Sequence, residues 1–312
     1  MSIKYERKGS LTAVGARSGD LLDKSMNEWL KIDEDTPLHF LQFFRKSVPD
    51  TDNFKLATIG DELGFPRLRS DTDPVPYDTP PPGYSANWDL ATYQNGIAAT
   101  ERLVMYDRSG QLAFIMGGLP KSFRRFYEYG MANTVETAAA TTGADNVYGF
   151  HASHPHRGAG GGTWSNLETS AVMDSTSVNA MWVNMANRTN AFGFATNLRM
   201  KKIFGPTKWR EKMVQLVNSD KVPETNVNAV NAYKGMQYEV AETLTQSTTA
   251  WYGWGDLPEQ QWGFHLIEWK APTITGLPED PNYPLIVRRY FGYCRVVFGM
   301  SIPYNMHYNA GV

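Results

Sequence analysis

The stretch from Leu119 to Thr142 constrains the fold of this chain more than any other. It reads LPKSFRRFYEYGMANTVETAAATT, and its apolar or small residues recur at the three-and-four spacing of an amphipathic helix. Pro120 suits the first turn, where its missing N–H has no partner to lose, and Gly143 marks the expected end. At about 1.5 Å per residue the helix would be roughly 35 Å long. We expect one buried face, formed by Phe123, Phe126, Tyr127, Gly130, Met131, Val135, Ala138 and Ala139.

Length, charge and cysteine content exclude several classes of protein. The chain has 312 residues, which predicts two subdomains or one domain with long excursions. Its net charge is −2, which argues against a strongly basic protein that binds nucleic acid through its overall charge. Cys294 is the single cysteine, which excludes an intrachain disulfide and a cysteine-based zinc site. The N-terminus is polar, so we expect no signal peptide, and no apolar run is long enough to span a bilayer.

Short elements are expected ahead of the long helix. Residues 1–18 are polar and predict a flexible arm. An amphipathic stripe follows, with Asp20 as a candidate cap, and a second short helix is expected after Thr36, with Pro37 in its first turn. Such small helices need a surface to lie against, in their own body or in a neighbouring subunit. The apolar positions are Leu21, Leu22, Met26, Trp29 and Leu30 in the first and Phe40, Leu41 and Phe44 in the second.

Residues 54–107 are expected to form a large hairpin. The outgoing arm is FKLATIGDELGF (54–65), and the returning arm is GIAATERLVMYD (96–107). Between them, DPVPYDTPPPGYSANW (73–88) contains five prolines, which make a chain stiff, extended and poor at sheet pairing. This segment is either a surface linker or an arm that reaches another molecule.

The region after the long helix alternates between helices and strands. Residues 145–166 are rich in Gly and His and are expected to be loop. A helix capped by Asp174 or Ser175 should run to Arg188, and a second should occupy residues 206–219. Strands are expected in 197–205, 231–244, 248–256, 264–272 and 285–300. The inward side chains of the two helices are expected to be Val178, Met181, Trp182 and Met185, and Trp209, Met213, Leu216 and Val217.

The sequence motifs do not indicate a catalytic site. His151, His154 and His156 form H-x-x-H-x-H, a spacing at which histidines can converge on a metal, but no further ligands in a recognisable context accompany them. The glycines of RGAGGG at 157–162 match neither a P-loop nor a dinucleotide fingerprint, and no G-x-S-x-G occurs. Lys121, Arg124 and Arg125 form a solvated helix face or an ion-pair contact with a neighbour. We therefore expect no catalytic, cofactor-binding or metal-binding residue, and no enzyme.

The order of the elements resembles the major capsid proteins of tailed bacteriophages, which have the Hong Kong 97-type shell fold, and within them the Mu-like major head subunit. Three stretches carry the resemblance: the long helix followed by YGFHASHP and SNLETSAVMDSTSVNAMW; IFGPTKWREKMVQLVNSDKVPETNVNAVNAYKGMQYEVAETLT; and TTAWYGWGD followed by a return strand and VRRYFGYCRVVFG. It covers nearly all of the chain from about residue 50.

This resemblance implies an α+β fold of four parts. Residues 1–50 would be an N-terminal arm and 51–107 an extended loop. Residues 108–164 and 263–297 would form a peripheral domain around the long spine helix, and residues 165–262 and 298–312 an axial domain.

The resemblance also implies a function and partners. The protein would self-assemble, as hexamers and pentamers, into the icosahedral shell that encloses the double-stranded DNA of a tailed phage, located in the virion and assembled in the host cytoplasm. DNA contact would be non-specific, a separate scaffolding protein and a portal are expected, a decoration protein is an open partner, and no membrane is involved. Lys55 is the one lysine between Ser47 and Pro120, at the base of the loop, so a loop-lysine crosslink is not supported. The alternatives are an encapsulin-like nanocompartment shell and, from another class, a metal-dependent hydrolase using His151, His154 and His156.

Overall fold

The computed structural model describes residues 38–51, 53–57, 83–100, 111–156, 162–190, 193–223, 229–276 and 287–312. The expected arm at 1–18, the expected stripe at 20–30, and residues 58–82 and 101–107 of the expected hairpin lie outside these residues, so the proline-rich segment 73–88 is described only from residue 83. Two compact units divide the described chain. Unit 1 comprises residues 91–126 and 270–295, and unit 2 comprises residues 38–90, 127–269 and 296–312.

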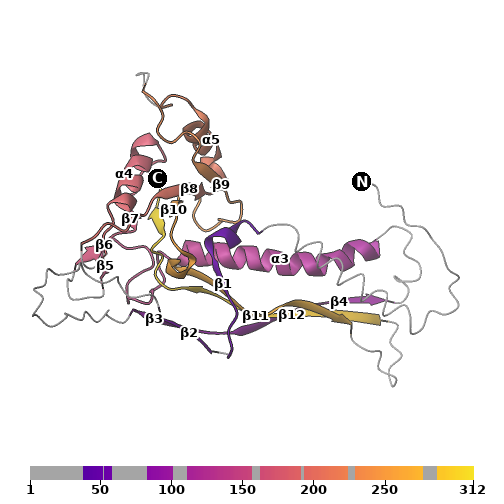
Figure 1. Ribbon diagram of the computed structural model, residues 1–312. Helices are drawn as coiled ribbons and strands as arrows, with labels where there is room; N and C mark the ends of the chain where they lie inside the picture. The colour runs from indigo at the N-terminus through magenta and orange to yellow at the C-terminus, as the bar shows by residue number, and fades with distance from the viewer. Residues whose placement is uncertain are drawn as a thin grey trace, which may run out of the picture. The chain divides into compact units, whose positions relative to one another are not determined.

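The long helix is confirmed, but its expected bounds are wrong. Helix α3 runs from Gln111 to Thr137, so it begins before Leu119 and ends before Thr142 (Figure 1). Pro120 lies inside the helix and not in its first turn, although a proline there removes one backbone hydrogen bond. The run Gly117–Pro120 is typical of a helix break, which explains why the sequence places the start too late. Most of the expected face is buried, namely Phe123, Tyr127, Met131, Val135 and Ala138.

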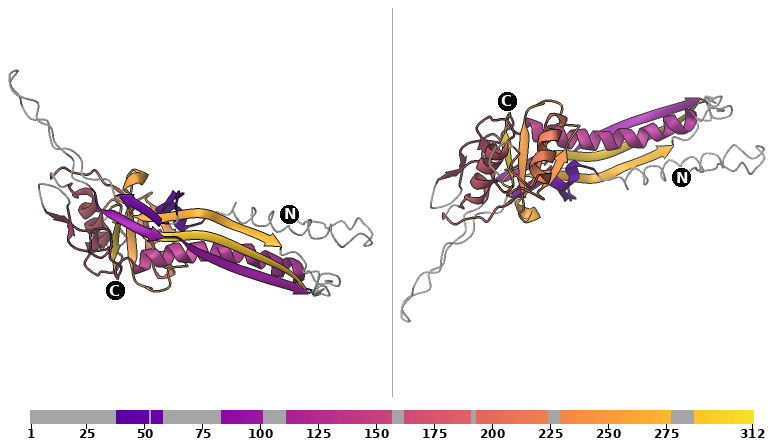
Figure 2. Two further views of the ribbon diagram at one scale, coloured as in Figure 1. Left: turned by 90° about the horizontal axis from the view of Figure 1, so that it is seen from below. Right: turned by 90° about the horizontal axis from the view of Figure 1, so that it is seen from above.

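In unit 1, residues 111–126 of α3 lie along β-strands. These are β4 (Ala91–Thr100) and the parts of β11 (Phe264–Gly276) and β12 (Val287–Met300) that fall in unit 1. With β1 (Arg45–Ser47), a strand of unit 2, they make up a four-stranded sheet of order β1-β11-β12-β4. Figure 2 shows α3 beside β4 and β12. The contact is close, because a Cβ on Gly292 would lie 2.4 Å from Cε2 of Phe123. The ring of Phe126, which is half-buried, contacts that of Tyr93 on β4 at 4.4 Å.

The expected hairpin has a different returning arm. Strand β2 (Asn53–Ala57) pairs antiparallel with β3 (Ser85–Asp89), from Asn53 opposite Asp89 to Ala57 opposite Ser85. The stretch 96–107 was expected to return along β2, but residues 91–100 form β4 of the other sheet. Strand pairing is a tertiary property that alternation within one segment does not specify, so the β propensity was visible and the partner was not.

Unit 2 is built on a five-stranded sheet of order β7-β13-β10-β8-β9. Its strands are β7 (Leu167–Glu168), β13 (Met306–Asn309), β10 (Trp251–Gly255), β8 (Met200–Gly205) and β9 (Gln237–Val240). Helices α4 (Ser175–Ala186) and α5 (Arg210–Asn218), the latter preceded by the 3-10 turn η3 (Thr207–Trp209), belong to the same unit (Figure 1). Buried side chains of both helices and of β8 and β10 share one hydrophobic core.

Helix α4 begins as expected and buries less than expected. The Asp174 carboxylate caps it by accepting a hydrogen bond from the Ser177 backbone N–H at 2.6 Å, and Ser177 completes a capping box. Val178, Met181 and Met185 are fully buried, but Trp182 is 39% exposed, so its inward placement was wrong. In α5 and η3, by contrast, Trp209, Met213, Leu216 and Val217 are all buried as expected.

Smaller elements complete unit 2. The expected helix after Thr36 is a short 3-10 helix, η2 (Phe40–Phe43), from which Phe40 and Phe43 contact Phe204 of β8. The expected histidine loop contains a two-stranded ribbon, β5 (His154–Pro155) with β6 (Thr163–Trp164). A 3-10 turn, η4 (Glu259–Gln261), precedes β11. None of the described helices combines the length and apolar character that crossing a membrane requires.

Candidate functional site: histidine network and exposed surfaces

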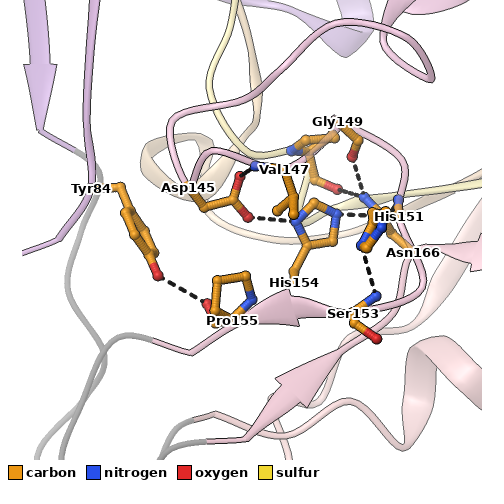
Figure 3. A network of polar contacts seen from close by, with 10 residues as sticks. Tyr84, Asp145, Val147, Gly149, His151, Ser153, His154, Pro155 and Asn166 are labelled. Carbon is orange, nitrogen blue, oxygen red and sulfur yellow. Dashed lines mark hydrogen bonds and ion pairs between the residues drawn. The ribbon is translucent and has the colours of Figure 1, made fainter.

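The expected metal motif places His154 at the centre of a buried hydrogen-bond network (Figure 3). His154 is fully buried, and its Nδ1 lies 2.6 Å from Oδ2 of Asp145, which is also buried. Its Nε2 lies 3.0 Å from Oδ1 of Asn166, and the ring stacks on Trp164 with centroids 4.3 Å apart. Both ring nitrogens are thus engaged by protein atoms.

Asn166 organises the loop around this histidine. Its Nδ2 donates to the Gly149 carbonyl at 2.7 Å, which leaves Oδ1 as the acceptor for His154 Nε2–H and for the His151 backbone N–H at 2.8 Å. His151 accepts a hydrogen bond at Nδ1 from the Ser153 backbone N–H at 3.1 Å, and its ring meets the His154 ring edge-on with centroids 6.1 Å apart (Figure 3). Among the described residues no group of three or more His, Cys, Asp or Glu is arranged to hold a metal ion.

A second buried network, which the sequence did not reveal, surrounds Arg188. Its guanidinium donates to the carbonyls of Tyr304 and, at 2.9 Å, Ser165, and lies 4.5 Å from the centre of the Trp164 ring. Burial lowers the pKa of Arg188 to about 10, so it remains a cation at neutral pH. Nη2 donates to His307 Nδ1 at 3.1 Å. The arrangement holds the end of the chain to the segment before α4.

Burial keeps two further histidines neutral. It lowers the pKa of His307 to about 4, against the opposing contact of its Nε2 with Glu168 Oε1 at 3.2 Å. Burial, reinforced by the Arg45 charge, likewise lowers the pKa of His265 to about 4. Burial raises the pKa of Glu168, but hydrogen bonds from His307 and Asn184 outweigh it and leave the pKa below its ordinary value. These polar groups serve the packing of unit 2.

The cations singled out in the sequence lie apart from this network. Lys121 and Arg125 are exposed on α3, and Arg124 is half-buried there. Lys55 is exposed on β2, directly opposite Asn87 in the ribbon. No described feature combines these residues with a nucleophile or a general base.

The surface of α4 has an unusual composition for a solvent-facing helix. No residue from Ser175 to Ala186 is charged, although the exposed face of a surface helix is ordinarily rich in charge. Trp182 and Val183 are exposed on it, and Val172 just before it is 46% exposed. The hydrophobic content of this helix was visible in the sequence, but which members face outward was not.

Comparison with known proteins agrees with this architecture. The fold is similar to that of the mature capsid of bacteriophage PhiM1 (TM-score 0.59, 8% identity, 89% of this chain and 88% of that chain). It is also similar to structures of Microbacterium phage Oxtober96 (TM-score 0.55, 9% identity, 89% and 92%) and Mycobacterium phage Patience (TM-score 0.54, 11% identity, 100% and 95%). No curated protein matches the chain. The fold is that of tailed-phage capsid subunits, the Hong Kong 97 type expected from the sequence.

The sequence itself carries the signature of this class. A profile described as phage capsid protein matches residues 83–294, more than half of the chain, and the chain belongs to this family. It is thus a major capsid protein, a structural component of the virion and not an enzyme.

Proposed function

We propose that this capsid protein self-assembles, through hexamers and pentamers, into a closed shell around the double-stranded DNA of a tailed phage. Membership of the phage capsid family carries the proposal. The net charge of −2 supports it, because DNA can pack densely inside a shell whose subunits do not bind its phosphates tightly. A separate scaffolding protein, a portal and a decoration protein are the further partners that a shell of this class would use.

The part of the proposal that concerns subunit contact is supported by α4. Interfaces are depleted in charge at their centre and enriched in tryptophan, and truncation of such anchors often costs much of the binding energy. Trp182 and Val183 provide this composition on an uncharged helix, and Val172, just before the helix, adds to it. We assign the exposed face of α4 to a contact between copies of this chain in the shell.

We also propose that the chain is divided into an arm, an extended loop, a peripheral domain and an axial domain, as the resemblance to phage capsid proteins implies, with one correction. An arm at 1–50, a peripheral domain at 108–164 and 263–297 and an axial domain at 165–262 and 298–312 remain our assignment. The extended loop of 51–107 is shortened, because β4 pairs within the four-stranded sheet. The β2–β3 ribbon is then its base.

Electron microscopy of the purified protein, with nuclease treatment before particle lysis, tests the proposal. We expect closed icosahedral particles that, when isolated from a productive infection, protect genome-length double-stranded DNA. Closed particles filled with a protein cargo and no protected DNA would identify a nanocompartment shell instead. A protein that stays monomeric under all conditions would contradict shell assembly.

A further inference from the structure

The described part of unit 1 has a one-sided charge. Its residues 91–100, 111–126, 270–276 and 287–295 contain seven Lys or Arg and no Asp or Glu. The connections 101–110 and 277–286 add two Arg and four acidic residues by sequence, which still leaves a net charge of +5. A chain with a total charge of −2 has therefore concentrated its positive charge here.

One face of β12 organises part of this charge. Tyr290 and Cys294 are buried, and Gly292 between them faces Phe123 of α3. Because successive side chains of a strand point to opposite faces, Arg289, Phe291, Tyr293 and Arg295 share the face turned away from α3.

Arg289 is exposed on this face, and Phe291 and Tyr293 are half-buried, with near-parallel rings 6.2 Å apart. Lys270 of β11 joins them, since its ammonium lies 4.2 Å from the centre of the Tyr293 ring and donates to its hydroxyl. We call Arg289, Phe291, Tyr293, Arg295 and Lys270 the basic-aromatic stripe.

Cations around a partly exposed aromatic pair fit a partner that is both acidic and apolar. Duplex DNA offers phosphates but no apolar face, and aromatic side chains gain from nucleic acid mainly by stacking on unpaired bases. An amphipathic acidic helix can contact both kinds of side chain in the stripe. Its carboxylates would pair with the cations, and its apolar side chains would pack on the aromatic rings.

The chain itself contains such a segment. Residues 20–35, DLLDKSMNEWLKIDED, have six acidic and two basic residues, a net charge of −4, together with an apolar stripe that includes Trp29. The proline-rich residues 58–82 are also acidic, but their net charge of −3 is spread over a longer stretch, and their prolines prevent a continuous helical face. Charge density and amphipathic spacing both favour residues 20–35.

We propose that the basic-aromatic stripe of unit 1 is the docking surface for the acidic segment 20–35 of this chain. Docking offsets most of the net charge of +5 on residues 91–126 and 270–295, because the segment carries −4, and it covers Phe291 and Tyr293. The inference is independent of what the shell encloses.

Photo-crosslinking of the full-length protein tests this assignment. Benzoylphenylalanine replaces Trp29 in one sample and Tyr77 in another, and the crosslinked peptides are identified by mass spectrometry. We expect position 29 to crosslink to residues 270–276 or 287–295, and position 77 not to. Mixing isotopically light and heavy protein shows whether the segment comes from the same copy or a second one, and either supports the proposal.

Charge reversal provides the matched control. Arg289→Glu should lower the crosslink yield from position 29 by about five- to tenfold, and adding Asp33→Arg, Glu34→Arg and Asp35→Arg should restore it. Arg210→Glu, at an exposed cation of unit 2, should have no effect. Crosslinks from position 29 that map outside residues 270–276 and 287–295, or a yield that Arg289→Glu leaves unchanged, overturn the proposal. If, in addition, Arg289→Glu abolishes salt-dependent binding of a duplex DNA fragment, the face belongs to nucleic acid.

Discussion

The ring of Phe298 lies against the backbone of α3 at Gly130, where an added Cβ would come within 2.4 Å of a ring carbon. Gly118, on the same helix, has no atom within 4 Å of the equivalent position. One glycine of α3 is thus required by packing, and the other is not.

The two glycines predict opposite effects of the same substitution. Gly130→Ala should lower the free energy of unfolding by about 1–2 kcal/mol, because overpacking outweighs the gain in helix propensity. Gly118→Ala should raise it by about 0.5–1 kcal/mol, as alanine does at an unstrained helical position. Urea denaturation of the unassembled subunit measures both, and equal shifts would show that Phe298 does not pack on Gly130.

Acid should destabilise the subunit before the carboxylates titrate. His265 and His307 have folded-state pKa values of about 4, well below the unfolded value of about 6.5. Between these values the unfolded chain binds more protons, so the free energy of unfolding falls as the pH falls. The loss is at most about 3 kcal/mol per histidine. Melting temperatures from pH 8 to 4 should show this, with a smaller slope for His307→Gln below pH 6.5 and an unchanged slope above pH 7.

The histidine network should contain no stoichiometric metal. Protein purified without chelator should hold well under one equivalent of zinc by elemental analysis, because Asp145 and Asn166 already engage both ring nitrogens of His154. His154→Ala should reduce stability by about 1–3 kcal/mol through the buried polar partners it leaves behind. A full zinc equivalent that disappears in this variant would restore the metal-site hypothesis.

Trp182 should matter for assembly and not for folding. Trp182→Glu places a charge on an exposed position of α4, so the subunit should keep its circular dichroism and change its unfolding free energy by about 0.5 kcal/mol or less. Particle formation by sedimentation should fall sharply. Thr176→Glu, also exposed on α4 but in its first turn, is the control and should assemble normally. Normal particles from Trp182→Glu would remove α4 from the subunit contacts.

The proline-rich tip should also serve assembly. Residues 74–82 contain five prolines, and stiff chain loses little entropy on docking. Replacement of residues 61–80 by a short Gly-Ser turn leaves the β2–β3 ribbon intact and should give a soluble subunit with near-native circular dichroism. This variant should form irregular shells or none by electron microscopy. Normal shells would refute the assembly role, and loss of the fold would show that the tip packs on its own body.

The structure also limits which aromatic residues can anchor that tip. Trp88 lies on β3, where its ring contacts those of Phe54 and His265, and Tyr84 donates a hydrogen bond to the Pro155 carbonyl at 3.3 Å. Both contacts are made within the subunit. Tyr77 is the tip aromatic to test as an interface anchor.

Periodicity predicted the elements of this fold better than their partners. The apolar spacing of α5 and the apolar runs of β10 and β12 were sufficient, because burial on one or both faces leaves a local signature. The spacing at 178, 181 and 185 likewise located the buried face of α4, but position 182 lies at its margin, where hydrophobicity alone gives the wrong side. The predicted start of α3 was wrong because the run Gly117–Pro120 is typical of a helix break. In the folded chain the helix continues through this run.

The histidine network was beyond sequence reasoning for a different reason. H-x-x-H-x-H shows which groups are present, but the nitrogen atoms of His154 are committed by Asp145 and Asn166, neither of which belongs to the motif. Arg188 and His307 are far apart in sequence and meet in the folded chain. The hydrogen-bond partners of buried polar side chains are set by proximity in the folded chain. The spacing of residues in the sequence does not predict them.

Strand β13 comes from residues 306–309, yet it lies between β7 and β10 in the five-stranded sheet, with Tyr308 opposite Leu167 and Met306 opposite Trp254. Strand β7 therefore reaches β10 only through β13, a segment far from it in the sequence. The sheet of unit 2 is complete only when these distant segments have met, so it cannot form piecemeal along the chain. A subunit whose β13 has detached loses the link between β7 and the rest of the sheet.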